Sequence, residues 1–126
     1  MLPLVFLSAP ALAEEAMSGT EFDSYTRGKT FYYAEDGSPY GGEEYLDGRR
    51  VRWSFLDGHC KEGTWFQDGR LICFVYEDDP DPSCWSFYRD RGGLIARLGD
   101  DPDKIMLYEA SQSDEPMLCL GPEVGV

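Results

Sequence analysis

The sequence predicts an all-β fold, an eight-stranded antiparallel up-and-down meander that closes into a small barrel after a short N-terminal helix. One observation behind this prediction is the dipeptide Asp-Gly, which recurs in steps of 11, 10 and 11 residues at 36–37, 47–48, 57–58 and 68–69. Asp-Gly tolerates the positive φ angles that tight hairpins need. The other is that the segments between turns are short and rich in aromatic and β-branched residues, which is typical of strands.

Length and charge limit the classes of protein that this chain can belong to. It has 126 residues, with 24 acidic against 11 basic side chains and a net charge of −13. The length suits one domain, over 14–126, and a hydrophobic content of 42% is too high for a disordered acidic tail. Because nucleic acids and anionic membranes would repel this charge, neither is expected as a partner.

Residues 1–13 are predicted to be a secretory signal rather than part of the fold. They carry no charge and end in Ala11-Leu12-Ala13, the small-x-small pattern that a signal peptidase accepts. The stretch is too short to span a bilayer, which needs roughly 20 apolar residues, and no later segment is long and apolar enough. We therefore expect a periplasmic or secreted protein. The alternative is a buried apolar segment, which Pro3 and Pro10 disfavour as a helix.

The mature chain is expected to begin with a short helix over 20–27. Ser18 or Thr20 could cap it, and Gly28 stands where it would stop. Phe22 and Tyr25 would share its apolar face.

After this helix the chain reads as strands joined by tight turns. Later turns use Asp and Pro at 78–82, Gly at 92–93, and Gly, Asp and Pro at 99–103. Since such turns leave no room for parallel crossovers, consecutive strands should pair antiparallel, and closure would remove both exposed edges. The expected strands lie near 29–34, 40–46, 50–56, 60–67, 70–77, 83–89, 93–98 and 104–109.

The four cysteines indicate two disulfides, as is usual for an even count in a small exported chain. If the strands around 78–79 pair symmetrically, residue 76 faces 81 and Cys73 faces Cys84, close enough to bond. That pairing leaves Cys60 with Cys119. Differently paired or free thiols are the alternative. No Cys-x-x-Cys spacing supports a zinc or redox site.

The segment 60–93 has a pattern in which the strand with Gly63-Thr64-Trp65 precedes one with Cys73 and a hairpin partner with Cys84. This pattern resembles the core of small exported lipocalin-like β-barrel proteins of unknown function from proteobacteria. The tail over 117–126 resembles the ending of relatives in alphaproteobacteria. The resemblance implies export and a β fold, and it brings no known activity or catalytic residues.

No set of residues stands out as catalytic. His59 is the only histidine, and its neighbour Cys60 would point to the opposite face of a strand, so a Cys-His pair is not expected. No phosphate loop or Ser-His-Asp set is visible, and abundant acidic residues make chance carboxylate pairs common. We expect no catalytic residue and no cofactor, and the protein is not expected to be an enzyme.

A repeated acidic tetrapeptide, Asp-Asp-Pro-Asp, is the weak candidate for metal binding. It occurs at 78–81 and 100–103, and a meander would place both turns at the same end of the sheet. Clustered carboxylates can bind Ca²⁺, but neither copy has the spacing of an EF-hand, and Asp and Pro are common turn residues. We expect no metal, and the weak candidates are Asp78, Asp79, Asp81, Asp100, Asp101 and Asp103.

Aromatic and basic side chains supply the candidates for a ligand or partner surface. The arginines could meet an acidic partner, but the preferred interpretation is that they neutralise Glu43, Glu44 and Asp47 on the neighbouring strand. Aromatic rings could line a ligand cup, although a barrel of such short strands is narrow and the rings would largely fill it. The candidates are Trp53, Trp65, Trp85, Arg49, Arg50 and Arg52.

Two functions fit these expectations. The favoured one is a non-enzymatic envelope module that binds an unknown protein partner through its surface. The alternative is a carrier that holds a small apolar ligand in the mouth of a lipocalin-like barrel. A cavity above roughly 300 Å³ would favour the carrier, and a filled interior beside an exposed apolar patch would favour the surface module.

Overall fold

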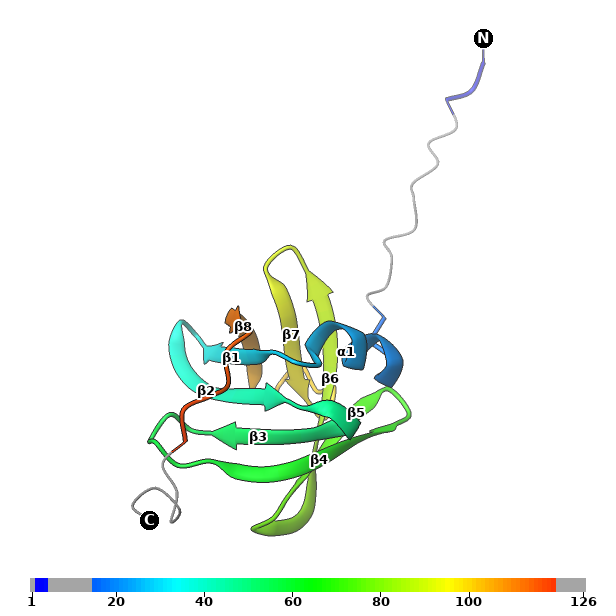
Figure 1. Ribbon diagram of the computed structural model, residues 1–126. Helices are drawn as coiled ribbons and strands as arrows, with labels where there is room; N and C mark the ends of the chain where they lie inside the picture. Colours follow the sequence, from blue (N-terminus) through cyan, green and yellow to red (C-terminus); the bar gives the residue numbers. More distant parts are fainter. Residues whose placement is uncertain (1, 5–14, 120–126) are drawn as a thin grey trace, which may run out of the picture.

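The strands close into a ring, as the turn spacing predicts, and follow one another around it in chain order, with β1 paired to both β2 and β8 (Figure 1). The computed structural model describes residues 2–4 and 15–119, so most of the predicted signal at 1–13 lies outside the described residues. The elements are α1 (Gly19–Thr26), β1 (Thr30–Glu35), β2 (Ser38–Tyr45), the 3₁₀ turn η1 (Asp47–Arg49), β3 (Arg50–Ser54), β4 (Lys61–Asp68), β5 (Leu71–Tyr76), β6 (Asp79–Asp90), β7 (Gly93–Leu98) and β8 (Met106–Ser113).

The helix α1 closes one end of the barrel. Ser18 caps it: its hydroxyl accepts from the Glu21 amide, and the Glu21 carboxylate accepts from the Ser18 amide, both at 3.1 Å. Phe22 is fully buried and packs edge-on against Tyr45 and Trp65, with ring centroids 5.4 and 5.2 Å away. Phe22, which the sequence predicts on the apolar face of the helix, therefore fills the barrel interior at this end.

Positive φ angles occur at the predicted Asp-Gly turns. Asp36 and Gly37 have φ of 48° and 81°, the pattern of a two-residue hairpin turn whose twist matches that of its strands. Gly48, Gly58 and Gly69 have φ of 72°, 91° and 60°. These turns set the lengths of the first five strands.

The hairpin of β5 and β6 agrees with the predicted pairing near its cysteines and differs at its tip. Cys73 faces Cys84, but a bulge intervenes and Tyr76 faces Asp79 rather than Asp81. Three residues of β6, including both prolines, lie opposite one residue of β5. A bulge accommodates prolines, which have no amide hydrogen to give a ladder, so β6 starts at residue 79 instead of 83.

The ring is unevenly closed. The ladder between β7 and β8 has three residue pairs, whereas the ladders on either side of β5 each extend over more. The residues between these two strands, 99–105, form the last turn before the barrel closes against β1.

Both predicted disulfides are present, Cys73–Cys84 within the hairpin and Cys60–Cys119 across 59 residues of sequence. The second ties the segment after β8 to the start of β4. Among the described residues no helix has the length and apolarity that crossing a membrane requires.

Candidate functional site

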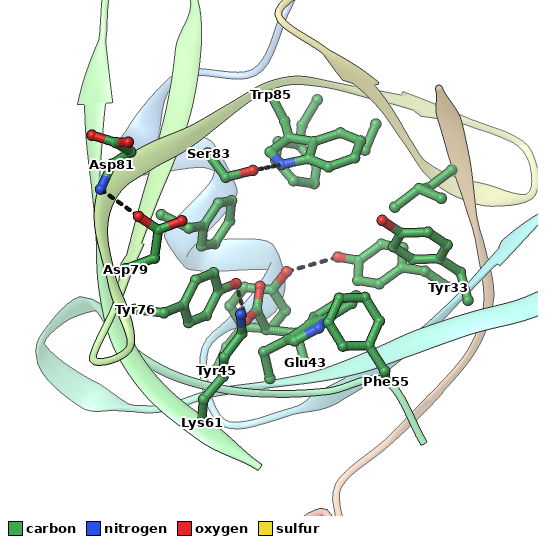
Figure 2. Close-up of a pocket in the computed structure, with 16 residues that line it drawn as sticks. Tyr33, Glu43, Tyr45, Phe55, Lys61, Tyr76, Asp79, Asp81, Ser83 and Trp85 are labelled. Atoms are coloured by element: carbon green, nitrogen blue, oxygen red, sulfur yellow. Dashed lines mark hydrogen bonds between the residues drawn. The ribbon is translucent and has the colours of Figure 1, made fainter. Parts of the chain in front are cut away.

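A cup of about 150 Å³ lies at the barrel end away from α1 (Figure 2). Every strand contributes to its wall, and nine of its sixteen lining residues are aromatic. The volume is below the roughly 300–1,000 Å³ typical of drug-sized ligand sites. It equals that of a cavity known to hold a molecule of benzene's size. The aromatic lining residues are Tyr33, Tyr40, Tyr45, Trp53, Phe55, Phe74, Tyr76, Trp85 and Phe87.

One layer of rings separates this cup from the helix. Tyr45, Phe74 and Phe87 line the cup and also contact Phe22 of α1. The interior is therefore filled on the α1 side, as the abundance of aromatic residues predicts, and hollow on the other.

Two strand glycines make room for rings in the wall. A Cβ on Gly41 would overlap the indole of Trp53, and a Cβ on Gly63 would overlap the Val75 carbonyl and lie 2.8 Å from the Tyr76 ring. Gly41 also belongs to the inward face of β2 that carries Glu43 and Tyr45, because alternate strand residues share a face. The absence of a side chain at Gly41 and at Gly63 therefore allows the rings of Trp53 and Tyr76 to occupy their positions in the wall.

A buried carboxyl group forms part of the inner wall. Glu43 is 3% exposed and accepts a 2.7 Å hydrogen bond from the Tyr76 hydroxyl, while the hydroxyls of Tyr33 and Tyr45 pair with each other at 2.7 Å. Burial raises the pKa of Glu43 to about 8, against the opposing effects of hydrogen bonds from Tyr76 and Tyr45 and of the Lys61 charge. At neutral pH this group is therefore a protonated acid that can both donate and accept.

The neighbouring phenols stay neutral. Burial is the main cause that raises the pKa of Tyr33, Tyr45 and Tyr76 well above the usual value of 10. The inner wall therefore offers four hydroxyl or carboxyl groups without fixed charge below pH 8.

Charge is concentrated at the rim. The Lys61 Nζ lies 4.8 Å from the ring centroid of Tyr76, 5.7 Å from that of Phe55 and 3.5 Å from Asp78 Oδ1. Asp79 and Asp81 also line the cup, and Asp79 Oδ1 accepts from the Asp81 amide at 2.9 Å. The rim thus has exposed carboxylates and one ammonium that sits over aromatic faces.

The structure separates the candidate tryptophans. Trp53 and Trp85 line the cup, and the Trp85 indole donates to the Ser83 hydroxyl at 2.9 Å. Trp65 instead lies at the α1 end, 3% exposed, with the Arg49 guanidinium 4.4 Å from its ring centroid. A ligand in the cup would therefore meet two of the three indoles.

The expected neutralisation of acidic residues by arginine is wrong for Glu43. Arg52 pairs with Glu44 at 3.5 Å, and Arg50 donates to the Asp47 backbone carbonyl at 3.2 Å. Glu43 points inward because β2 alternates, so it is buried among phenols instead. The signal was present in the sequence, because Glu43 is two residues from Tyr45 and must share its face.

The two acidic turns lie at the same end of the ring, where β5 meets β6 and β7 meets β8, as the meander predicts. Asp101 Oδ1 accepts from the Asp103 amide at 2.9 Å, and Asp100 accepts from Ser86 and Tyr88 at 2.8 and 2.6 Å. Over 2–4 and 15–119, no three His, Cys, Asp or Glu side chains are grouped so as to hold a metal ion. These carboxylates act in the described structure as turn and strand hydrogen-bond partners.

His59 lies in the exposed loop before β4, where its amide donates to Asp57 Oδ1 at 2.9 Å. Its neighbour Cys60 is bonded to Cys119. Cys60 therefore has no free thiol that His59 could activate.

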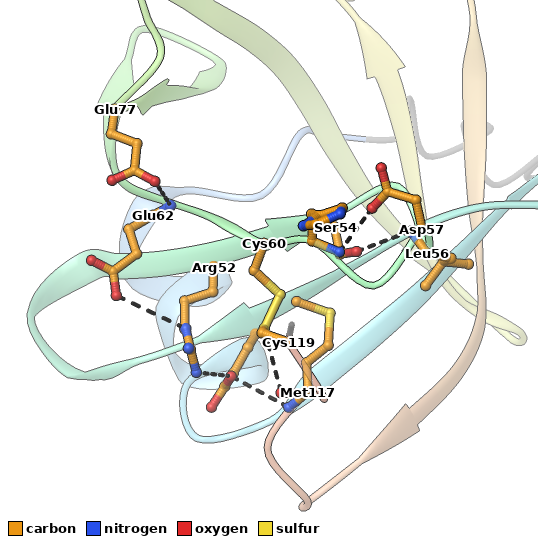
Figure 3. The surroundings of a disulfide bond; sticks show 11 residues. Arg52, Ser54, Leu56, Asp57, Cys60, Glu62, Glu77, Met117 and Cys119 are labelled. Atoms are coloured by element: carbon orange, nitrogen blue, oxygen red, sulfur yellow. Dashed lines mark hydrogen bonds and ion pairs between the residues drawn. A yellow bond between two sulfur atoms is a disulfide. The ribbon is translucent and has the colours of Figure 1, made fainter. Parts of the chain in front are cut away.

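The segment that follows β8 packs on the outer wall (Figure 3). Cys119 anchors it, the Met117 amide donates to Glu44 at 3.4 Å, and the Met117 side chain is buried against Gly42. A shallow depression of about 580 Å³ runs between this segment and the exposed side chain of Leu56.

No family model, curated protein or solved structure matches the chain. The resemblance to lipocalin-like exported proteins therefore stays a prediction.

Proposed function

We propose that this protein is a small-ligand-binding barrel that works outside the cytosol, with the cup as its binding site. The observation that carries the proposal is the protonated Glu43, buried beside three phenols in the wall of a solvent-open aromatic cup. A few polar groups converging in a largely aromatic hollow are what small-molecule sites have in common.

Stability alone does not explain such a cluster. Burying a carboxyl group costs free energy even when it is hydrogen-bonded, and an apolar side chain at position 43 would fill the barrel more favourably. Perturbed acids in a cleft are concentrated at functional sites. The small volume of the cup limits the size of a ligand to about that of benzene and is compatible with binding such a molecule.

The location is the second part of the proposal. Two disulfides are consistent with an extracytoplasmic protein, because they persist in oxidising compartments. The predicted signal at 1–13 supports export to the periplasm or beyond. Binding without turnover remains our expectation for this site.

Protein-observed ¹H–¹⁵N NMR during titration with a library of molecules of six to eight heavy atoms tests the proposal. We expect hits to shift the indole resonances of Trp53 and Trp85 and to leave that of Trp65 in place, because only the first two line the cup. The variant Ala96→Leu adds carbons to the wall and should abolish these shifts. Ala110→Leu, on an exposed position of β8, is the matched control and should retain them. Shifts that are equal at all three indoles would contradict the proposal.

A protein partner is the second candidate, favoured by two exposed apolar side chains in the loop after β3, of which Leu56 borders the outer depression. Phe55 and Leu56 are 56% and 45% exposed, and Leu56 has a φ of 66° that holds it outward in the loop. Crosslinking in the native envelope should give a discrete adduct that Leu56→Asp removes and Phe66→Asp, an exposed position on β4, preserves. An adduct unaffected by Leu56→Asp would exclude this surface.

A further inference from the structure

We propose that the ligand of the cup is a small organic cation, an amine or a quaternary ammonium, whose charged head takes the place now held by the Lys61 ammonium. This inference rests on the proposed function and specifies its ligand class.

The aromatic faces of the cup already accept an ammonium group. The Lys61 Nζ lies 4.8 Å from the ring centroid of Tyr76 and 5.7 Å from that of Phe55, and Figure 2 shows its side chain extending from β4 toward Tyr76 and Glu43. Trp53 and Tyr40 extend the same aromatic wall, with ring centroids 5.8 Å apart. Aromatic cages of this kind recognise quaternary ammonium groups through the negative faces of their rings.

The charges around the cup also favour a cation. The carboxylates of Asp79 and Asp81 line its rim, against the single ammonium of Lys61, and Glu43 adds a third negative charge when it ionises. The whole chain has a net charge of −13, which attracts cations to the mouth and repels anions.

Lys61 can leave without losing all of its partners. Its side chain is 28% exposed, and Asp78, which is itself 58% exposed, lies 3.5 Å away. A lysine side chain is long and flexible, so it can follow this carboxylate into solvent while a ligand occupies the rings. Lys61 thus acts as a placeholder that keeps the aromatic faces covered.

Glu43 gives the exchange a pH dependence. The ligand cation adds a positive charge beside Glu43 while Lys61 remains paired with Asp78 at the rim, so the ionised carboxylate is favoured and binding releases the Glu43 proton to solvent. Affinity should then rise with pH up to about 8, where the free group ionises by itself. The other groups that face Glu43 are the phenols of Tyr33, Tyr45 and Tyr76, the ammonium of Lys61 and, at the rim, the carboxylates of Asp79 and Asp81. The phenols remain neutral over this range because their pKa values are raised well above 10.

Calorimetry with two probes of the same shape tests the inference on the full disulfide-bonded chain. Choline is the cation, and 3,3-dimethylbutan-1-ol is its neutral isostere, with carbon in place of nitrogen. Both have seven heavy atoms, close to benzene in size, and so suit a cup of about 150 Å³. We expect choline to bind at least about tenfold more tightly than the alcohol at pH 8.

The outcomes separate this inference from the proposed function. Equal binding of both probes would overturn the cation inference and leave the proposed small-ligand function standing. Binding of neither probe would overturn the cation inference, and the absence of any hit from the library described above would overturn the proposed function as well. An affinity for choline that falls as the pH rises from 6 to 8 would overturn the role of Glu43.

Matched variants locate the effect. Glu43→Gln should weaken choline binding at pH 8 about tenfold and remove its pH dependence, and it should weaken binding of the uncharged alcohol much less. Glu44→Gln, the same change on the adjacent outward-facing residue, should behave as wild type. Lys61→Met should strengthen choline binding, because it removes the competing ammonium. If Glu43→Gln does not fold, Asp79→Asn with Asp81→Asn replaces it at the rim, and unchanged choline affinity in that variant would contradict the charge argument.

Discussion

Glu43 links the pH of the medium to the stability of the barrel. Its pKa is about 8 in the folded protein and near 4.5 in an unfolded chain, so the folded state holds the proton more tightly. The stabilisation is complete below pH 4.5 and is lost as the pH rises toward 8 and above.

We therefore expect the unfolding free energy of the wild type to fall, relative to Glu43→Gln, by on the order of 3 kcal/mol between pH 5 and pH 8. Urea denaturation of both proteins at the two pH values measures this difference. A constant difference between the two proteins would mean that Glu43 is ionised throughout or solvated in the folded state.

Gly41 is the residue at which the cup depends on the absence of a side chain. Gly41→Ala places a methyl group inside the volume of the Trp53 indole, so we expect a loss of about 1–3 kcal/mol and a change in tryptophan fluorescence. Gly92→Ala is the control, since its Cβ would meet Asp90 at an ordinary 3.5 Å, and it should stay within about 0.5 kcal/mol of wild type. Equal effects of the two substitutions would show that Trp53 yields freely.

The sequence contained part of the site at this scale. Trp53 and Trp85 could be proposed as ligand-facing because they alternate with polar residues in predicted strands, and the structure places both in the cup. The contact between Lys61 and Tyr76 could not be proposed from the sequence. It depends on the pairing of β4 with β5 and on the space that Gly63, which has no Cβ, leaves for the Tyr76 ring. Such a close approach leaves no periodic signal.

At the scale of single elements, Phe22 is the aromatic side chain of α1 that is fully buried against the barrel. Phe22→Ala removes a ring that contacts four others, so we expect a loss of about 3–5 kcal/mol in unfolding free energy. Thr20→Ala, on the exposed side of the same helix, should cost less than about 0.5 kcal/mol. Thermal unfolding of both variants decides the matter, and comparable losses would mean that the helix acts through its caps rather than through Phe22.

Most elements were predictable because their signals are local. The Asp-Gly turns and the alternation between them set five strands to within a few residues, and Ser18 with Gly28 marked the helix. The start of β6 was not predictable, because Pro80 and Pro82 read as a turn and only a bulge in the pairing with β5 lets them continue as strand. A bulge depends on how two strands pair, so it cannot be predicted from the residues of one strand alone.

At the scale of the whole molecule, the disulfides stabilise the barrel against unfolding by different amounts. Cys60–Cys119 closes 59 residues and Cys73–Cys84 closes 11, so the chain-entropy treatment gives about 4 and about 3 kcal/mol. Replacing both members of one pair by serine should lower the unfolding free energy in that order. Denaturant titration measures it, and a larger loss for the short loop would show that packing around Cys73 outweighs the loop-length effect.

The narrow ladder of β7 and β8 decides where this ring gives way first. Only three residue pairs join β7 to β8, so we expect the amide protons of these strands to exchange with deuterium faster than those of the β5–β6 hairpin, which also has a disulfide. Separation of β7 from β8 would open the closed barrel and expose two edge strands. Each edge strand could then pair with a strand of another copy of the protein. We therefore expect self-association of the partly unfolded protein to begin at the separated edges of β7 and β8.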